Sequence, residues 1–129
     1  MKVLTLEQLL EIHALVIEST GGSIGLRDLG RLEAAIATQT QNVFGEELYS
    51  GAIEKAAALI RGVIADHPFV DGNKRTAMLT GLTLLDINGS HFKAKDTELE
   101  NFAVAIATKK LDIPAIVEWL RGHHPINLT

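Results

Sequence analysis

The segment at residues 73–87 constrains the fold most, because its apolar residues fall on nearly every side of a helix. A helix that is apolar all round is stable in water only when other elements cover it. Gly81 would let a neighbouring helix approach closely, and Gly89 would end the segment. The sequence therefore predicts a buried central helix with the apolar residues Ala77, Met78, Leu79, Leu82, Leu84, Leu85 and Ile87.

Three further helices are predicted before the central one. Thr5 and Gln8 form a capping box at the start of the first. Asp28 is the expected N-cap of the second helix, and Ser50 is the expected N-cap of the third. The polar segment 39–46 has no helical period, so we expect a loop or a short hairpin between the second and third helices.

The third predicted helix leads directly into a short polar motif. Its apolar residues follow one helix face, and His67 falls on the same line, so we expect His67 to face inward at the helix end. Pro68 disfavours continuation of the helix, and Gly72 permits the tight turn that follows. The apolar residues of this face are Ile53, Ala56, Ala57, Ile60, Val63 and Ile64.

Two helices are predicted after the central one. The first starts near Thr97, with a capping box to Glu100, and the second opens at Asp112 and stops near Gly122. With 129 residues, of which 47% are hydrophobic, the chain is long enough for one core. We therefore expect an all-α fold, a compact bundle of about six helices in which residues 1–129 form a single domain.

Composition limits the partners and the compartment. The formal net charge of −4 argues against a surface that binds nucleic acid or an anionic membrane. The absence of cysteine excludes disulfides and thiolate metal sites, and favours a reducing cytoplasm. The first residues lack the apolar stretch of a signal peptide, and charges interrupt the longest apolar runs, so we expect no membrane-spanning helix.

Residues 67–77, HPFVDGNKRTA, place an imidazole, a carboxylate, a turn and two cations within eleven positions. This set fits phosphoryl transfer, which needs neutralised phosphate oxygens and an acceptor for the proton of the attacking hydroxyl. The N–H groups around Gly72, Asn73 and Lys74, at the start of a buried helix, would form an anion cradle. The sequence thus predicts a site for a small anionic ligand.

Four side chains complete this interpretation. Asp71 is placed to hold a divalent cation, because Mg²⁺ usually takes only one or two protein carboxylates. Lys74 and Arg75 would offset the remaining charge, and Arg75 is suited to a forked contact. A neutral His67 would accept the proton of an attacking Ser, Thr or Tyr hydroxyl.

Each of these residues has a structural alternative, which the sequence leaves open. Asp71 would cap the following helix, and an inward His67 would be a hydrogen-bonded core residue. Lys74 and Arg75 would lie on a solvated face. Phe69 is expected to anchor the loop in the core rather than to contact a substrate.

The remaining histidines lack the spacing of metal ligands, and we interpret His91, His123 and His124 as incidental. His13 lies in line with the apolar residues of the first helix and is expected to be a hydrogen-bonded, partly buried residue. Phe102 and Trp119 are expected to belong to the core.

The motif HPFVDGNKRTA resembles the signature of the Fic/Doc family, which is His, any residue, Phe, any residue, Asp or Glu, Gly, Asn, any residue, Arg. The chain matches every fixed position, at His67, Phe69, Asp71, Gly72, Asn73 and Arg75. The stretch GLRDLGRLEAAI at residues 25–36 and the compact length are similar to the Doc branch, the death-on-curing toxins of bacterial toxin–antitoxin pairs.

The resemblance implies an all-α Fic fold whose motif lies between two helices. It implies a flap, here at residues 39–46, that aligns the backbone of a target protein. The implied activity uses ATP and Mg²⁺ to phosphorylate a threonine of elongation factor Tu, which halts translation in the cytoplasm. An antitoxin whose tail folds as a helix into a groove would neutralise the toxin. The implied roles are general base for His67, magnesium binding for Asp71, and phosphate contacts for Gly72, Asn73, Lys74 and Arg75.

Two departures bear on the reaction. Lys74 stands where many AMP-transferring members have Gly, and Met78 stands where they have a second Arg. For Doc-like members with Lys, the resemblance implies a reversed nucleotide that presents its γ-phosphate. AMP transfer and a non-enzymatic module that binds an anion or a partner remain as alternatives. Ser50 and Glu54 have the spacing of the family's inhibitory helix, but Lys55 follows, and we interpret this segment as the start of the third helix.

Overall fold

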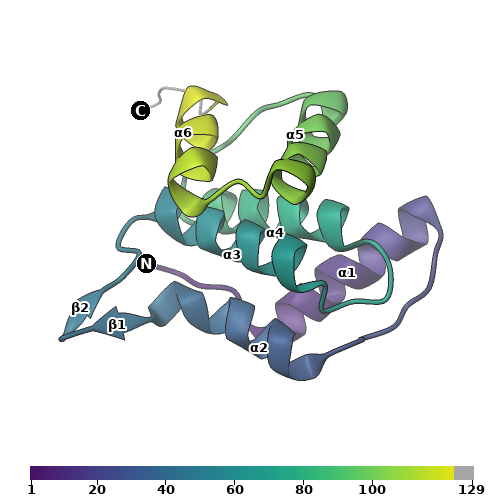
Figure 1. Cartoon of the computed structure of the whole chain (residues 1–129), viewed down its shortest axis with the longest axis horizontal. Coiled ribbons are helices and arrows are strands. Elements are labelled where there is room, and N and C mark those ends of the chain that lie inside the picture. Colours follow the sequence, from purple (N-terminus) through teal and green to yellow (C-terminus); the bar gives the residue numbers. More distant parts are fainter. Residues whose placement is uncertain (124–129) are drawn as a thin grey trace.

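The computed structural model describes residues 1–123, which are mostly helical (Figure 1). The elements are α1 (Leu6–Thr20), α2 (Leu29–Ala37), the 3₁₀ turn η1 (Thr38–Thr40), β1 (Asn42–Val43), β2 (Glu46–Glu47), α3 (Ala52–Asp66), α4 (Asn73–Ile87), α5 (Asp96–Lys109) and α6 (Ile113–His123). The predicted all-α bundle of about six helices, with a short hairpin before the third, is confirmed. In the described part of the chain, no helix combines the length and apolar character needed to cross a membrane.

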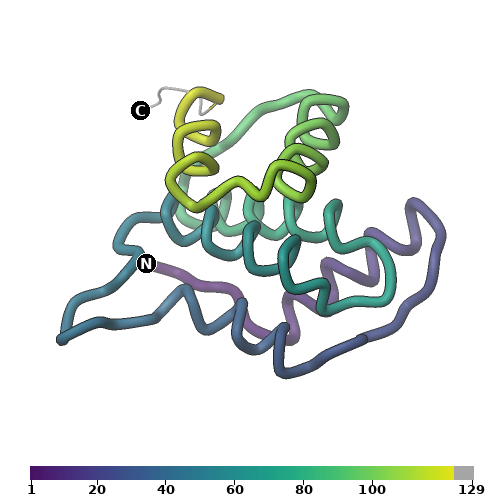
Figure 2. The backbone as a smooth tube through the Cα atoms, viewed as in Figure 1, coloured from purple at the N-terminus to yellow at the C-terminus, as the bar shows by residue number. Residues whose placement is uncertain are grey.

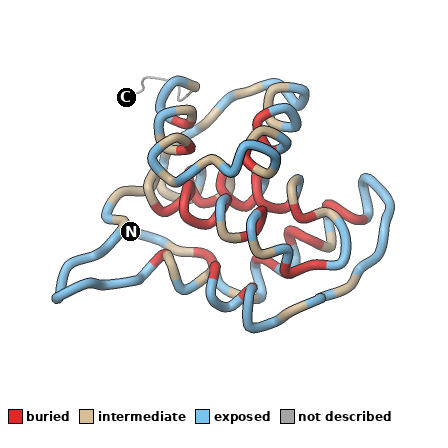
Figure 3. Tube along the Cα trace, viewed as in Figure 1, coloured by how far each residue is buried: buried red, intermediate tan, exposed pale blue. Residues whose placement is uncertain are grey.

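Helices α3 and α4 form the middle layer of the molecule (Figure 1). They pack against each other more extensively than any other pair, while α1 and α2 cover one side and α5 and α6 cover the other. Buried residues follow α3 and α4 along most of their length (Figure 3). The buried centre of the fold is therefore a pair of helices rather than the single helix that was predicted. Leu79, on one apolar side of α4, is 39% exposed and is not covered by another element of the described chain.

Local sequence features set most of the helix starts. Thr5 accepts from the Gln8 N–H at 3.2 Å, and the Gln8 side chain accepts from the Thr5 N–H at 2.9 Å, which confirms the capping box. Asp28 caps α2 by accepting from the Arg31 N–H at 3.1 Å. Asp112 accepts from a backbone N–H in the first turn of α6. These hydrogen bonds satisfy N–H groups that have no partner within their helix.

Two predicted caps are wrong. The N-cap of α3 is Gly51, which makes no side-chain capping bond, and not Ser50. Helix α5 starts at Asp96, because the carboxylate of Glu98 accepts from the Lys95 N–H at 3.0 Å. This hydrogen bond lowers the pKa of Glu98 below its ordinary value. Glu98 thus takes the capping role that the sequence suggested for Glu100.

The hairpin is fastened at its base by a buried lysine. Lys55, which is only 2% exposed, donates to the carboxylate of Glu47 at 2.9 Å and to the main-chain carbonyl of Gln39. The buried side chain of Gln39 in turn bonds both the N–H and the carbonyl of Leu4. These contacts join the N-terminal segment, the hairpin and α3. Gln39 is thus part of the buried framework, although it was predicted to lie in a loop.

The position of the hairpin does not fit the role of a flap beside the motif. The hairpin precedes the first residue of α3, and the motif follows its last, so the 15 residues of this helix, about 22 Å, separate them. Figure 2 shows the hairpin and the loop between α3 and α4 on opposite sides of the molecule. The expectation that residues 39–46 align a target at the motif is therefore wrong for this structure.

Gly81 is required by the close packing of α3 against α4. A Cβ atom at Gly81 would lie 2.4 Å from Cδ1 and 2.6 Å from Cγ1 of Ile60, which is fully buried. Gly122, near the end of α6, has open space around its Cβ position.

We expect Gly81→Ala to lower the free energy of unfolding by about 1–3 kcal/mol, because the added methyl group overpacks the core. Gly122→Ala is the control, and we expect it to leave stability unchanged or slightly raised. Urea denaturation measures both effects. Adding Ile60→Val should restore part of the loss in Gly81→Ala, and equal stability of the two glycine variants would contradict the packing argument.

Candidate active site

The loop between α3 and α4 begins with a left-handed residue. His67 caps the end of α3 with φ 49° and ψ 58°, and its N–H donates to the carbonyl of Val63 at 3.2 Å. Because α3 ends at Asp66, the side chain of His67 leaves the line of the buried helix face. His67 is exposed, so the expectation of an inward residue is wrong, and its imidazole is available at the surface.

Phe69 anchors the loop in the core, as predicted, and is 1% exposed. The ring of His13 stacks on Phe69 with 3.8 Å between ring centroids and an interplanar angle of 7°. Nε2 of His13 lies 2.9 Å from the main-chain oxygen of Asp71 and donates to it. His13 is therefore a hydrogen-bonded buried residue, as interpreted. Its contact with the motif, 58 positions away along the chain, was not visible in the sequence.

Asn73 ties the loop to the first turn of α4. Its side-chain oxygen accepts from the Phe69 N–H at 3.0 Å, and its Nδ2 donates to the Phe69 carbonyl at 2.8 Å. These two bonds fix the orientation of the amide, so Nδ2 also faces Nδ1 of His67, at 3.2 Å, as a donor. A neutral imidazole in this contact has its lone pair on Nδ1 and its hydrogen on Nε2.

Asp71 and Gly72 leave the start of α4 without a side-chain cap. Gly72 is the N-cap, with φ 76°, and a Cβ atom there would lie 3.1 Å from Cδ1 of Ile17. The carboxylate of Asp71 accepts from the Ser23 N–H at 2.9 Å instead of capping the helix. The capping alternative for Asp71 is therefore wrong, and the first N–H groups of α4 are available to an anion.

An extended segment lies beside the motif where the flap was expected. The Arg27 N–H donates to the Pro68 carbonyl at 2.7 Å, and the Val70 N–H donates to the Gly25 carbonyl at 2.9 Å. Leu26 and Phe69 form an isolated antiparallel bridge between these two bonds. A short strand-like pairing thus joins the connection between α1 and α2 to the motif.

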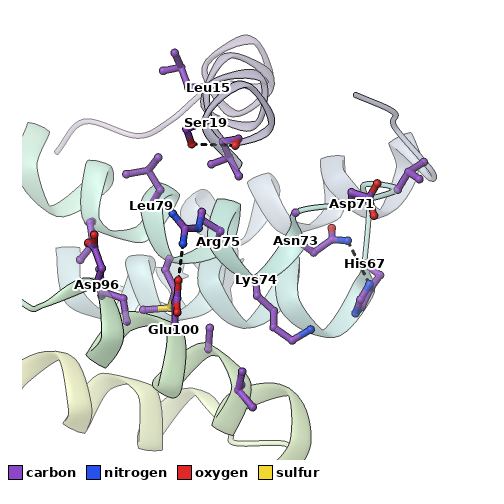
Figure 4. Close-up of a pocket in the computed structure, with 18 residues that line it drawn as sticks. Leu15, Ser19, His67, Asp71, Asn73, Lys74, Arg75, Leu79, Asp96 and Glu100 are labelled. Atoms are coloured by element: carbon purple, nitrogen blue, oxygen red, sulfur yellow. Dashed lines mark hydrogen bonds and ion pairs between the residues drawn. The ribbon is translucent and has the colours of Figure 1, made fainter. Parts of the chain in front are cut away.

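A cavity of about 870 Å³ brings all the predicted site residues together (Figure 4). The motif supplies one wall, and the remaining walls are mainly apolar side chains of α1, α4 and α5. Met78 lies in the wall as a buried residue, so the structure presents a thioether where a second cation was considered. The predicted residues along the cavity are His67, Asp71, Gly72, Asn73, Lys74 and Arg75.

The charges in the cavity are not those of the motif alone. Arg75 forms an ion pair with Glu100 of α5, with 2.5 Å between Nη2 and Oε1, and both side chains are about half exposed (Figure 4). Asp96, one turn earlier on α5, also lines the cavity. Within residues 1–123 no salt bridge involves Lys74, which is partly buried at the cavity wall. Sequence reasoning missed both acidic residues.

The other predicted features lie away from the motif. Glu54 pairs with Arg121 of α6 at 2.8 Å, in the first turn of α3, as expected for the start of that helix. His91 contacts Asp86 at 2.7 Å, and His123 contacts Glu98 at 3.3 Å. Phe102 is buried and stacks on Trp119, which confirms their place in the core, whereas His124 lies outside the described residues.

Comparison with known proteins identifies the family of the chain. A family model described as the Fic/DOC family matches residues 3–85. The chain is 38% identical to Toxin Doc of Mycolicibacterium smegmatis over 104 residues, which are 79% of this chain and 80% of that protein. It is 31% identical to Protein kinase doc of Escherichia phage P1 over 121 residues, which are 94% of each. The chain therefore belongs to the Fic/Doc family and is a Doc-like member of it.

Proposed function

We propose that this protein is a Doc-like toxin that transfers the γ-phosphoryl group of ATP to a hydroxyl side chain of a target protein. The observation that carries the proposal is the cavity, which places an imidazole, a carboxylate, two cations and the uncapped start of a helix along one wall. The relative from phage P1, which aligns over nearly the whole chain, is named a protein kinase.

The triphosphate would bind at the start of α4. The N–H groups of Asn73 and Lys74 belong to the first turn, where a helix carries partial positive charge and no side chain competes as a cap. Lys74 and Arg75 would neutralise the phosphate oxygens, Lys74 as a point charge and Arg75 through a fork. Arg75 would exchange its contact with Glu100 for these phosphate oxygens.

Asp71 would hold Mg²⁺ against the phosphates. Its carboxylate is exposed, and the Ser23 N–H fixes one of its oxygens while the other stays available. A single carboxylate fits magnesium, which takes most of its remaining ligands from phosphate and water. When bound, the ion would supply charge neutralisation for the transferred group.

His67 would act as the general base. In the transfer, the target oxygen forms a bond to the γ-phosphorus while the bond from that phosphorus to the bridging oxygen breaks, and ADP leaves. The hydroxyl proton goes to Nδ1 of His67, where the neutral ring keeps its lone pair. The contact with Asn73 is lost when the proton arrives, because Asn73 also presents a donor.

The identity of residue 78 supports phosphoryl transfer over AMP transfer. Met78 provides no cation to the cavity wall, so a triphosphate in the AMP-transferring orientation, which presents its α-phosphate, would have one anchor fewer. Lys74, in contrast, adds a cation at the start of the helix. AMP transfer is the second candidate, and the position of the transferred label separates the two.

The target would bind along the extended segment beside the motif. Leu26 uses neither its N–H nor its carbonyl in a hydrogen bond with any residue from 1 to 123, because the pairing with the motif uses the groups of its neighbours. This free edge can accept a target backbone as an added strand. Ile24 and Val70, which are 70% and 52% exposed, would contact its side chains. We propose a threonine of elongation factor Tu as the target, with arrest of translation in the cytoplasm as the result.

An antitoxin would bind the apolar part of the cavity. Leu15 of α1, Leu79 of α4 and Val104 of α5 line it and are all exposed. An amphipathic helix can place an apolar face in such a groove. The M. smegmatis relative is named a toxin, which favours a cognate antitoxin here.

The reaction is tested with purified elongation factor Tu, Mg²⁺ and ATP labelled at either the α- or the γ-phosphate. We expect γ-label on the target and no α-label. Label from the α-position would establish AMP transfer instead.

His67→Ala is the matched variant. We expect it to lose at least about 100-fold in transfer rate, because it removes the general base. It should lower the thermal unfolding midpoint only slightly, since His67 is exposed and, within residues 1–123, its ring makes one hydrogen bond, with Asn73. Full toxicity of this variant in cells without antitoxin would favour a non-enzymatic binding module.

Glu100→Gln should strengthen ATP binding up to about fivefold, because a half-exposed ion pair contributes less than about 1 kcal/mol. Removing the pair frees Arg75 for the phosphates. Asp96→Asn makes the same charge change on the same cavity wall at a residue that does not pair with Arg75, and we expect a smaller gain. Calorimetry with ATP and Mg²⁺ measures both, and weaker binding by Glu100→Gln would mean that Glu100 contacts the nucleotide.

Leu15→Glu should prevent neutralisation by the cognate antitoxin while the toxicity of the protein remains. Leu10→Glu is the control, because Leu10 is an exposed residue of the same helix that does not line the cavity. Growth of cells that co-express toxin variant and antitoxin is the measurement. Neutralisation of both variants would place the antitoxin elsewhere.

A further inference from the structure

The position of His67 depends on a backbone conformation that its own residue type disfavours. A left-handed conformation costs a residue with a side chain on the order of 1–2 kcal/mol, and His67 has φ 49°. Contacts from outside the loop must therefore hold this turn. The motif residue Asn73 supplies one of them, at the imidazole.

Arg27 supplies the main-chain contacts. Its Nε donates to the His67 carbonyl at 2.9 Å, and its Nη2 donates to the Asp66 carbonyl at 3.3 Å. Its own main-chain N–H donates to the Pro68 carbonyl at 2.7 Å. One residue thus binds three successive carbonyl groups across the end of α3 and the start of the loop.

Arg31, one turn further along, makes a more limited contact. Its Nη1 donates to the Asp66 carbonyl at 3.0 Å, and its Nε lies 3.4 Å from the carboxylate of Asp28. Both arginines therefore cap the last turn of α3, where the helix carries partial negative charge. Of the two arginines, only Arg27 also binds the main-chain carbonyl of His67. The two residues belong to the stretch 25–36, which is similar to the Doc branch. The sequence alone gave no structural role for these residues, and their contacts with the end of α3 now supply one.

We propose that Arg27 is a positioning residue that fixes His67 for its role as general base. The inference rests on the proposed function of His67. The guanidinium group is a rigid planar fork, so two adjacent carbonyls bound by Nε and Nη2 set the direction of the main chain that carries the imidazole. A displacement of about 1 Å at a reacting group can lower the rate about 100-fold.

Two other roles for Arg27 make different predictions. A residue that only caps α3 would affect stability and leave the turnover number kcat unchanged. A residue that contacts ATP or the target would raise a Michaelis constant KM. A positioning residue lowers kcat and leaves both KM values nearly unchanged.

Arg27→Met and Arg31→Met form the matched pair, because each loses a bond to the Asp66 carbonyl and only the first loses the bond to His67. We expect similar decreases in thermal unfolding midpoint. For Arg27→Met, kcat should fall at least about 10-fold with KM for ATP and target within about threefold. For Arg31→Met, kcat should stay within about twofold, and Arg27→Lys, which can bind one carbonyl, should lie between.

Equal kcat values for the two methionine variants, or a raised KM with unchanged kcat in Arg27→Met, would overturn the inference. The NMR signals of the His67 ring give a second readout that needs no activity. They should shift in Arg27→Met and stay in place in Arg31→Met, and unshifted signals in both would also overturn it. If the natural protein transfers no phosphoryl group, the proposed function is wrong. The NMR comparison would then still decide whether Arg27 fixes the position of the His67 ring. Arg27→Lys replaces Arg27→Met in each comparison if the latter does not fold.

Discussion

The structure of the site depends on the side chain of Asn73, which joins the loop to the helix that follows it. One amide bonds both main-chain groups of Phe69 and also faces the imidazole of His67. Because Asn73 is buried at the first position of α4, the proposed base and the anion cradle belong to one rigid unit. The stacked rings of His13 and Phe69 hold the same unit from the side of α1.

This unit forgoes stabilising interactions that an ordinary helix start would have. A capping side chain would contribute about 1 kcal/mol, yet Asp71 turns to Ser23 and leaves the N–H groups of α4 open. His67 occupies a backbone conformation that its residue type disfavours. Arg75 is held by an ion pair that is about half exposed and therefore adds little stability. Such local costs are typical of functional sites, where an open N-terminus, an exposed imidazole and a releasable cation are more useful than added stability.

The sequence predicted what is local. The cap at Thr5, the cap at Asp28 and the break at Pro68 depend on neighbouring residues, and the structure has all three. It did not predict the direction of His67, because the helical period that placed His67 inward ends one residue earlier. The polar segment 39–46 indicated a hairpin, and the helix predicted after it already separated it from the motif, so the flap expectation came from the resemblance alone. Glu100 was missed because only packing of α5 against α4 brings it to Arg75, 25 positions away.

The residues that hold the loop and the residues that face it come from different parts of the chain. His13, Ser23 and Arg27 all precede the motif and lie within residues 3–85, the region that the Fic/DOC family model matches. Helix α5, which supplies Glu100 and part of the apolar cavity wall, begins at Asp96, beyond that region. The cradle and its supports thus lie within the matched region, whereas the part of the cavity wall that α5 supplies lies outside it. The carboxylate of Glu100 on that wall pairs with Arg75 in the first turn of α4, and within residues 1–123 it makes no hydrogen bond to the loop at residues 67–72.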